Sequence, residues 1–165
     1  MIGGGAAKPA HLHTDARALL GVPIVSGYGL SECPGLAYNH VDDSDDVLAS
    51  DGRAVAGVEI RIVGREGDTL VPGQEGEIRA RGPMLFLGYL DAALDGDAID
   101  DNGWLRTGDL GRLDEGGNLR VTGRIKDVLA AHTDVADVAV VGLPDPERGE
   151  RCCAVVVPRD LDRPP

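Results

Sequence analysis

Apolar and polar positions in the first fifty residues follow the pattern of an α/β unit. Leucine and alanine recur at helical spacing over residues 11–20, and Gly21 is a favourable helix stop, so this stretch predicts a helix. The apolar run 22–25 predicts a short strand, and the glycine-rich residues 26–32 predict a loop after it. Residues 1–6 predict the end of another strand that runs into a glycine turn. Because α/β proteins bind ligands at loops that follow parallel strands, the loop at 26–32 is the first candidate site.

Strict alternation of apolar and polar residues replaces helical spacing after residue 50. Residues 58–63 and 76–81 both alternate, and the turn residues between them predict a hairpin. Shorter apolar stretches predict strands at 85–89, 110–113 and 119–121, and a tight turn is predicted at 114–118. Such a density of short strands favours a small barrel-like or curled sheet.

The last forty residues predict a mixed segment. Residues 127–132 are compatible with a short helix, and residues 135–141 and 152–157 predict strands separated by a loop at 142–150. The final residues are charged and rich in proline, which predicts a frayed end at 159–165.

These patterns predict an α/β plus β fold in three parts. Residues 1–50 are the tail of an α/β subdomain, residues 51–122 form a β-barrel-like subdomain, and residues 123–165 form a partial α+β lobe. A length of 165 residues allows one domain or two small lobes.

Charge and composition exclude several classes of function. The formal net charge of −12 repels phosphate backbones and anionic lipid headgroups, which argues against nucleic-acid and membrane-surface binding. No apolar run approaches the roughly 20 residues of a membrane span. Residues 1–10 lack the basic and apolar regions of a signal peptide, so a cytoplasmic protein is predicted.

Metal centres and disulfides are not favoured. The adjacent Cys152 and Cys153 are interpreted as small apolar fillers in a strand, and with Cys33 they make an odd count without disulfide spacing. The histidines lack the spacing of a metal site; they are His11, His13, His40 and His132. The acidic run 42–46 lacks the glycine and ligand spacing of a calcium loop, so it predicts a solvated loop.

The first block with candidate chemistry is the hexapeptide 27–32. Glycines at its first and third positions allow close backbone approach to a ligand, and Tyr28 between them can lie flat against a purine. Ser31 and Glu32 then offer a hydroxyl and a carboxylate for a phosphate and its magnesium ion. An ordinary strand and turn with a packed tyrosine is the alternative.

Two further positions suit a nucleotide. Asp109 follows a glycine turn, and its carboxylate can accept hydrogen bonds from both ribose hydroxyls. Arg124 follows Gly123 and offers a planar set of donors for a ribose or phosphate oxygen. In isolation, these two residues are also compatible with a turn aspartate and a surface arginine.

The order and spacing of these blocks resemble the adenylate-forming superfamily of acyl-CoA synthetases, firefly-type luciferases and peptide-synthetase adenylation domains. The resembling blocks are 27–32 (GYGLSE), 76–83 (GEIRARGP), 86–89 (FLGY), 104–110 (WLRTGDL), 123–127 (GRIKD), 135–145 and 147–150. The resemblance extends to about residue 158 and is strongest to bacterial acyl-CoA synthetases of medium-chain, cyclic or sterol-derived acids.

The resemblance implies a role for each nucleotide-facing residue. Tyr28 would stack on adenine, Asp109 would bind the ribose hydroxyls, and Arg124 would assist there. Ser31 would contact the AMP phosphate, and Glu32 would help to hold Mg²⁺. Four other implied sites are the pocket glycines Gly3, Gly4 and Gly5 and the cofactor-binding Gly29. Lys126 would lie at the hinge about which the C-terminal domain turns.

The resemblance also implies a reaction and its cofactors. In the family, the carboxylate of an acid, here a fatty or cyclic one, attacks the α-phosphate of ATP to give acyl-AMP and pyrophosphate, and coenzyme A then displaces AMP. The implied enzyme is therefore an acid–thiol ligase of fatty-acid metabolism that uses ATP, Mg²⁺ and coenzyme A.

Three departures from the family pattern predict that this sequence alone is not competent. The family's phosphate-binding loop lies upstream of these blocks, and the sequence starts at Met1 after it. The family's catalytic lysine lies beyond Pro165. That lysine stabilises the charge that develops on the transferring phosphate and lowers the barrier by roughly several kcal/mol. Lys126-Asp127 also runs directly into 128–132, which resembles a later helix, so a loop and a strand are predicted to be deleted.

The chain is therefore interpreted as an internal, further deleted fragment of a synthetase. Two alternatives stay open. One is a remnant that binds a nucleotide or pairs with a complementing chain without catalysis. The other is an adenylation domain that serves a carrier protein in place of coenzyme A.

Overall fold

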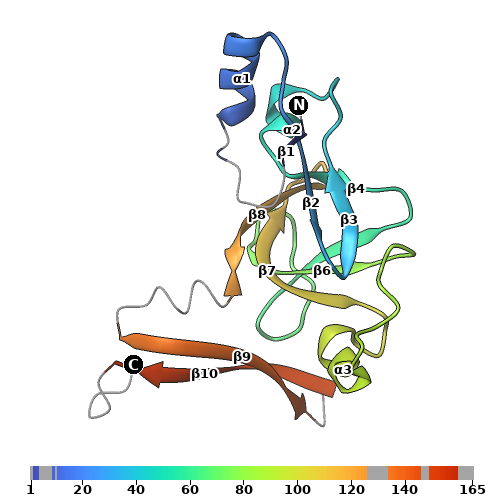
Figure 1. Cartoon of the computed structure of the whole chain (residues 1–165), viewed down its shortest axis with the longest axis vertical. Helices are drawn as coiled ribbons and strands as arrows, with labels where there is room; N and C mark the ends of the chain where they lie inside the picture. The colour runs from blue at the N-terminus through green and yellow to red at the C-terminus, as the bar shows by residue number, and fades with distance from the viewer. Residues whose placement is uncertain (1, 4–8, 10, 126–133, 146–148, 160–165) are drawn as a thin grey trace.

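The computed structural model describes residues 2–3, 9, 11–125, 134–145 and 149–159. β-strands are the main regular secondary structure of these residues, and the helices are few and short (Figure 1). The predicted β character is confirmed, and among the described residues of 1–50 the α/β character consists of two helices and one parallel strand pair.

The predicted N-terminal helix is confirmed as α1, Leu12–Leu20. Gly21 ends this helix in the left-handed conformation, at φ 72°, where a residue without Cβ is least strained. The Gly21 N–H donates to the carbonyl of Arg17 at 3.0 Å, which satisfies one carbonyl of the last turn.

One sheet carries most of the fold. Its strands are β1 Ile2–Gly3, β2 Val25–Leu30, β3 Cys33–Tyr38, β4 Gly52–Ala54, β5 Glu59–Val63, β6 Gly76–Arg81, β7 Leu105–Leu113 and β8 Asn118–Arg124. Their order across the sheet is β1-β2-β3-β4-β8-β7-β6-β5. The β1–β2 pair is parallel and the other neighbouring pairs are antiparallel.

The sheet curls around a core built from strands that are not neighbours. Ala37 of β3 and Ile62 of β5 are distant in the strand order but belong to one buried cluster with Ile78 and Leu119. Within the described residues the strand order has two ends, β1 and β5, so the predicted barrel-like subdomain takes the form of an open, curled sheet.

The remaining elements are short helices and a separate hairpin. The helices are α2 Asp45–Leu48, the 3₁₀ turn η1 Ala92–Leu94 and α3 Asp95–Ala98. The hairpin strands are β9 Val135–Asp145 and β10 Gly149–Pro158, which pair only with each other among the described residues (Figure 1). The predicted short helix at 127–132 lies outside the described residues.

Two predicted hairpins are confirmed. The strands expected at 58–63 and 76–81 are β5 and β6, which pair from Glu59↔Arg81 to Val63↔Glu77. The turn expected at 114–118 joins β7 to β8, where Asp114 accepts hydrogen bonds from the backbone N–H groups of Gly116 and Asn118.

The expectation for residues 22–32 was wrong. The strand begins at Val25 and continues through the predicted loop to Leu30. A Cβ at Gly27 would collide with the Tyr38 ring, and one at Gly29 would collide with the backbone of Pro34. These glycines therefore allow close approach of β2 to β3 and do not form a flexible loop.

Two other expectations were also wrong. Residues 85–89 form no strand, because Pro83 lacks a backbone donor and Gly88 has φ 140°, which interrupts extended pairing. The loop expected at 142–150 is largely strand, since β9 runs to Asp145 and β10 begins at Gly149.

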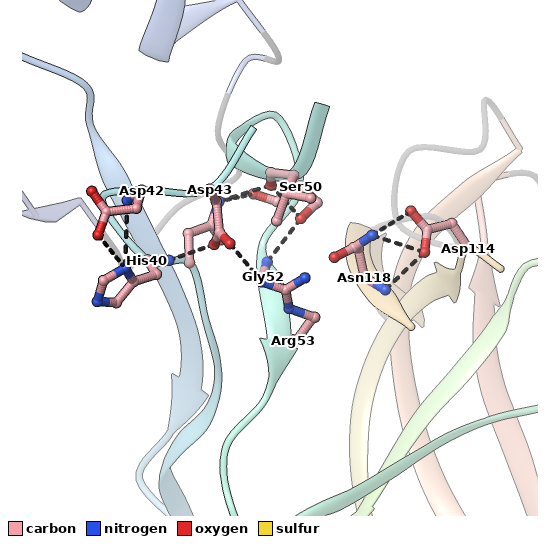
Figure 2. A network of polar contacts seen from close by, with 10 residues as sticks. His40, Asp42, Asp43, Ser50, Gly52, Arg53, Asp114 and Asn118 are labelled. Atoms are coloured by element: carbon pink, nitrogen blue, oxygen red, sulfur yellow. Dashed lines mark hydrogen bonds and ion pairs between the residues drawn. The ribbon is translucent and has the colours of Figure 1, made fainter. Parts of the chain in front are cut away.

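The acidic run 42–46 is more than a solvated loop. Figure 2 shows the Asp43 carboxylate between the backbone N–H of His40, at 2.6 Å, and the guanidinium of Arg53, at 2.5 Å. Asp45 accepts from Arg17 at 2.6 Å and so links α1 to α2. These contacts identify two of the aspartates as local anchors of the chain.

A cation–π stack fixes the start of β7, the strand that carries Asp109. The guanidinium carbons of Arg61 and Arg81 lie 4.0 and 4.7 Å from the ring centroid of Trp104. The Asp100 carboxylate accepts from the backbone N–H of Trp104 at 2.9 Å. Trp104, which directly precedes β7, is therefore fixed by both stacking and a hydrogen bond.

Candidate functional site

The candidate site is centred on the carboxylate of Asp109 in β7. Asp109 is only 4% exposed, and a buried carboxylate is costly unless it is paired or hydrogen-bonded. The Tyr28 hydroxyl, from β2, donates to its Oδ2 at 2.7 Å. The structure thus brings together two of the residues that the sequence assigned to a nucleotide.

Arg124 completes this cluster from the neighbouring strand. Asp109 and Arg124 are direct cross-strand partners of β7 and β8, and Arg124 Nε lies 2.9 Å from Asp109 Oδ1. The Arg124 side chain is 66% exposed, so solvent screens this ion pair. The Arg124 Nε–H is not aligned for a hydrogen bond to Asp109 Oδ1, and this oxygen has no hydrogen-bond donor among the described residues.

Thr107 fixes the backbone of Asp109. Its hydroxyl donates to the Ile78 carbonyl on β6 at 2.7 Å and accepts from the Asp109 N–H at 3.1 Å. Gly108 lies between Thr107 and Asp109 with φ 68°, a conformation that favours glycine. The glycine turn proposed from the sequence is therefore present as a local irregularity within β7.

Tyr28 acts as a hydrogen-bond donor because it keeps its proton. Burial is the main cause that raises the pKa of the Tyr28 phenol far above its usual range. The hydrogen bond to Asp109 and the charge of its carboxylate raise this pKa further, whereas Thr107 and Arg124 act in the opposite direction. The phenol is therefore neutral and donates to the carboxylate at physiological pH.

Ser31 and Glu32 lie in the turn between β2 and β3. Ser31 is exposed, and Glu32 Oε1 accepts from the Tyr89 hydroxyl at 2.7 Å. This hydrogen bond is the first cause, and burial the second, that raises the pKa of Tyr89 to about 12. The Glu32 carboxylate is thus oriented by a neutral donor that does not cancel its charge.

The other sequence-assigned positions are placed differently. Gly3 pairs with Ser26 in the β1–β2 ladder, and Gly29 lies within β2. Gly4, Gly5 and Lys126 lie outside the described residues.

Sequence reasoning missed Thr107 and Tyr89 as parts of the site. Thr107 stands in the same block as Asp109, so its position was a usable signal for a backbone contact. Tyr89 was assigned to a strand, and no local pattern indicated that its hydroxyl reaches Glu32 from 57 residues away.

A cavity of about 210 Å³ lies away from this cluster, beside the β7–β8 turn. Its lining includes two carboxylates and two guanidinium groups, those of Asp46, Asp114, Arg112 and Arg120. These charges balance, and neither Asp109 nor Tyr28 lines the cavity. The candidate site therefore rests on the hydrogen-bonded cluster and not on this cavity.

The described residues contain no group of three or more His, Cys, Asp or Glu side chains suited to a metal ion. The described helices are too short or too polar to cross a membrane.

Comparison with known families identifies the class of protein. The family described as AMP-binding enzyme matches residues 1–90, and the AMP-binding enzyme C-terminal domain matches residues 124–164. The first match alone covers more than half of the chain, so the chain belongs to the AMP-binding enzyme family. The resemblance to adenylate-forming acyl-CoA ligases is thereby confirmed.

Similar curated proteins are acid–CoA ligases. The chain is 39% identical over 155 residues to a medium-chain fatty-acid–CoA ligase of Escherichia coli K12, covering 83% of this chain and 27% of that protein. It is 40% identical over 162 residues to an indoleacetate–CoA ligase of Aromatoleum aromaticum, covering 86% of this chain and 32% of that protein. The chain therefore spans about a third or less of the length of these relatives.

Solved structures show the same relationship. The chain matches the amide bond synthetase McbA of Marinactinospora thermotolerans with a TM-score of 0.68 and 35% identity, over 99% of this chain and 37% of that one. It matches apo MatB of Rhodopseudomonas palustris with a TM-score of 0.71 and 30% identity, over 98% of this chain and 36% of that one. The described fold thus corresponds to part of a larger enzyme fold.

Proposed function

We propose that this chain forms the adenosine-binding part of an ATP-dependent ligase that converts a carboxylic acid to acyl-AMP and transfers it to coenzyme A. The observation that carries the proposal is the buried Asp109 carboxylate, held by Tyr28 and flanked by Arg124. This cluster combines an anionic acceptor, an aromatic ring and a donor-rich cation, which are the groups that a ribonucleotide needs.

In this proposal Asp109 accepts hydrogen bonds from the ribose hydroxyls. Its Oδ1 has no hydrogen-bond donor among the described residues and carries negative charge, so a hydroxyl donor there forms a charge-assisted bond. The exposed Arg124 side chain can turn from Oδ1 toward the ligand without disturbing the core. The Tyr28 ring supplies the stacking surface for adenine.

Ser31 and Glu32 take the phosphate side of the nucleotide. Magnesium commonly binds to one or two carboxylates together with substrate phosphates, so a single oriented Glu32 fits this role. Mg²⁺ would neutralise phosphate charge during acyl-AMP formation. Gly3, Gly4 and Gly5 would line the pocket, and Lys126 would lie at the hinge.

The substrate class is proposed as a fatty or cyclic carboxylic acid, with coenzyme A as the acceptor. The names of the relatives support this class, because they include ligases for a medium-chain fatty acid and for indoleacetate. Two alternatives to coenzyme A as the acceptor stay open. One is a carrier protein, and the other is an amine, because a structurally similar protein is an amide bond synthetase. We also propose that the three predicted parts, 1–50, 51–122 and 123–165, correspond to family subdomains.

A second candidate function is a nucleotide- or partner-binding remnant. Its support is the length of one alignment: 83% of this chain is about 137 residues, so the 155 aligned positions include about 18 at which this chain has no residue. A deletion of one loop and one strand, as proposed, would account for unmatched positions in that number. Such a remnant would bind the nucleotide and depend on a complementing chain for catalysis.

We expect no carboxylate-dependent exchange of pyrophosphate into ATP by the purified chain alone. The reason is that the proposed site provides contacts for adenosine, while the chain spans 27% of a ligase that it resembles. The assay uses octanoate and indoleacetate as acids, with the Asp109→Asn variant as the measure of background. Exchange that depends on the acid and is lost in the variant would contradict the proposal that this chain binds adenosine but cannot form acyl-AMP alone.

A further inference from the structure

We propose that Tyr28 is a positioning residue that acts through its hydroxyl on Asp109, and so sets the chain's preference for ligands with ribose hydroxyls. This inference rests on the proposed function and adds a second role to a side chain assigned only to stacking. The contact that carries it is the 2.7 Å hydrogen bond from Tyr28 Oη to Asp109 Oδ2.

The bond joins strands that are not neighbours. β3, β4 and β8 lie between β2 and β7 in the strand order, yet the Tyr28 hydroxyl reaches Asp109 across the curled sheet. The Tyr28 ring also packs against both buried clusters of the core, which restricts its movement. A donor held in this way restricts the rotation of the carboxylate that it contacts.

The carboxylate has one defined orientation as a result. Oδ2 is bound to Tyr28, and the backbone N–H of Asp109 is bound to Thr107. Oδ1 faces Arg124 Nε in an ion pair at 2.9 Å and has no aligned hydrogen-bond donor among the described residues. A fixed acceptor loses less conformational entropy when a hydroxyl binds, so ordering by Tyr28 favours ligands that carry that hydroxyl.

Arg124 is poorly suited to fix the carboxylate in place of Tyr28. Its side chain is 66% exposed and meets Asp109 through an ion pair without hydrogen-bond alignment. The partly buried Tyr28 side chain, which packs against both core clusters, is the more rigid partner. The ordering role is therefore assigned to the tyrosine.

The test separates the hydroxyl of Tyr28 from its ring. Tyr28→Phe keeps the aromatic surface for stacking and removes the donor to Asp109. Affinities for AMP and for 2′,3′-dideoxy-AMP, which lacks both ribose hydroxyls, are measured by calorimetry on the full chain. Tyr38→Phe is the matched control, because Tyr38 lies on the adjacent β3 and donates to the Pro34 carbonyl.

We expect Tyr28→Phe to weaken AMP binding about tenfold and to leave binding of 2′,3′-dideoxy-AMP within about twofold. Tyr38→Phe should change neither. Equal losses for both nucleotides would show a general structural effect and overturn the positioning role. No loss for either would show that the hydroxyl is dispensable. If the wild-type chain binds neither nucleotide, the proposed function itself fails, and the positioning role fails with it.

A second measurement does not depend on the folding of Tyr28→Phe. The ζ-carbon NMR chemical shifts of the chain's tyrosines are compared at neutral pH in the wild type and in Asp109→Ala. Because the Tyr28 hydroxyl donates to the Asp109 carboxylate, the variant should shift the Tyr28 resonance and leave that of Tyr38, which donates to the Pro34 carbonyl, in place. An unchanged Tyr28 resonance would overturn the hydrogen bond on which the inference depends.

Discussion

Ile78→Ala is expected to lower the free energy of unfolding by about 2–5 kcal/mol, because the lost side chain leaves a cavity in the core. Ile78 is fully buried and belongs to the cluster with Ala37, Ile62 and Leu119, which closes the curled sheet. Its carbonyl also accepts a hydrogen bond from the Thr107 hydroxyl. A displacement of β6 would therefore also displace the backbone beside Asp109. Small domains have about 5–15 kcal/mol of stability in total, so this loss is a large share of it.

Urea unfolding followed by circular dichroism measures this effect. Leu87→Ala is the control, since Leu87 is fully exposed at 106% and its truncation should change stability by less than about 0.5 kcal/mol. Similar losses for the two variants would contradict the assignment of Ile78 to the core.

Gly52→Ala is expected to destabilise the chain by about 3 kcal/mol or more, through strain and crowding together. Gly52 has φ 98°, which disfavours any residue with a Cβ. An added Cβ would also collide with the backbone of Tyr38, to which this part of β4 is paired through Arg53. Because the obstacle is backbone and not a flexible side chain, β3 and β4 would have to separate.

Gly67→Ala separates these two causes. Gly67 has a similar φ, 82°, but an added Cβ there would meet nothing within 4 Å. Only the conformational cost remains, about 1 kcal/mol. The difference between the thermal stabilities of the two variants measures the crowding at Gly52, and equal destabilisation would exclude crowding as a cause.

Much of the fold was predictable where one local rule applied without competition. Alternation alone located β5 and β6, because each has one face on the core and one toward solvent. Helical spacing with a glycine stop located α1. Local rules failed at β2, where Gly27 and Gly29 allow close packing against β3, a requirement that the partner strand imposes.

The helix α1 shows a second limit of the sequence pattern. Its spacing predicted an apolar face, but Leu19 and Leu20 are 83% and 58% exposed, while His13 and Ala16 are buried. The pattern identifies an apolar face and does not specify what covers it.

The candidate site was predictable as a set of residues but not as a geometry. The motif order nominated Tyr28, Asp109 and Arg124, and the structure brings all three together. The bond between the Tyr28 hydroxyl and Asp109 depends on the curl of the sheet, which brings β2 to β7 across three intervening strands. No local sequence pattern encodes that distance.

Calorimetric titration with a non-hydrolysable acyl-adenylate analogue tests the central claim, that this chain contains an adenosine-binding site built on Asp109. The titration compares the wild-type chain with Asp109→Ala, and circular dichroism establishes that both are folded. The account predicts micromolar binding by the wild type and a loss of at least about tenfold in the variant, because a charged acceptor has been removed. A folded wild-type chain that does not bind the analogue, or a variant that binds it equally well, would contradict the account.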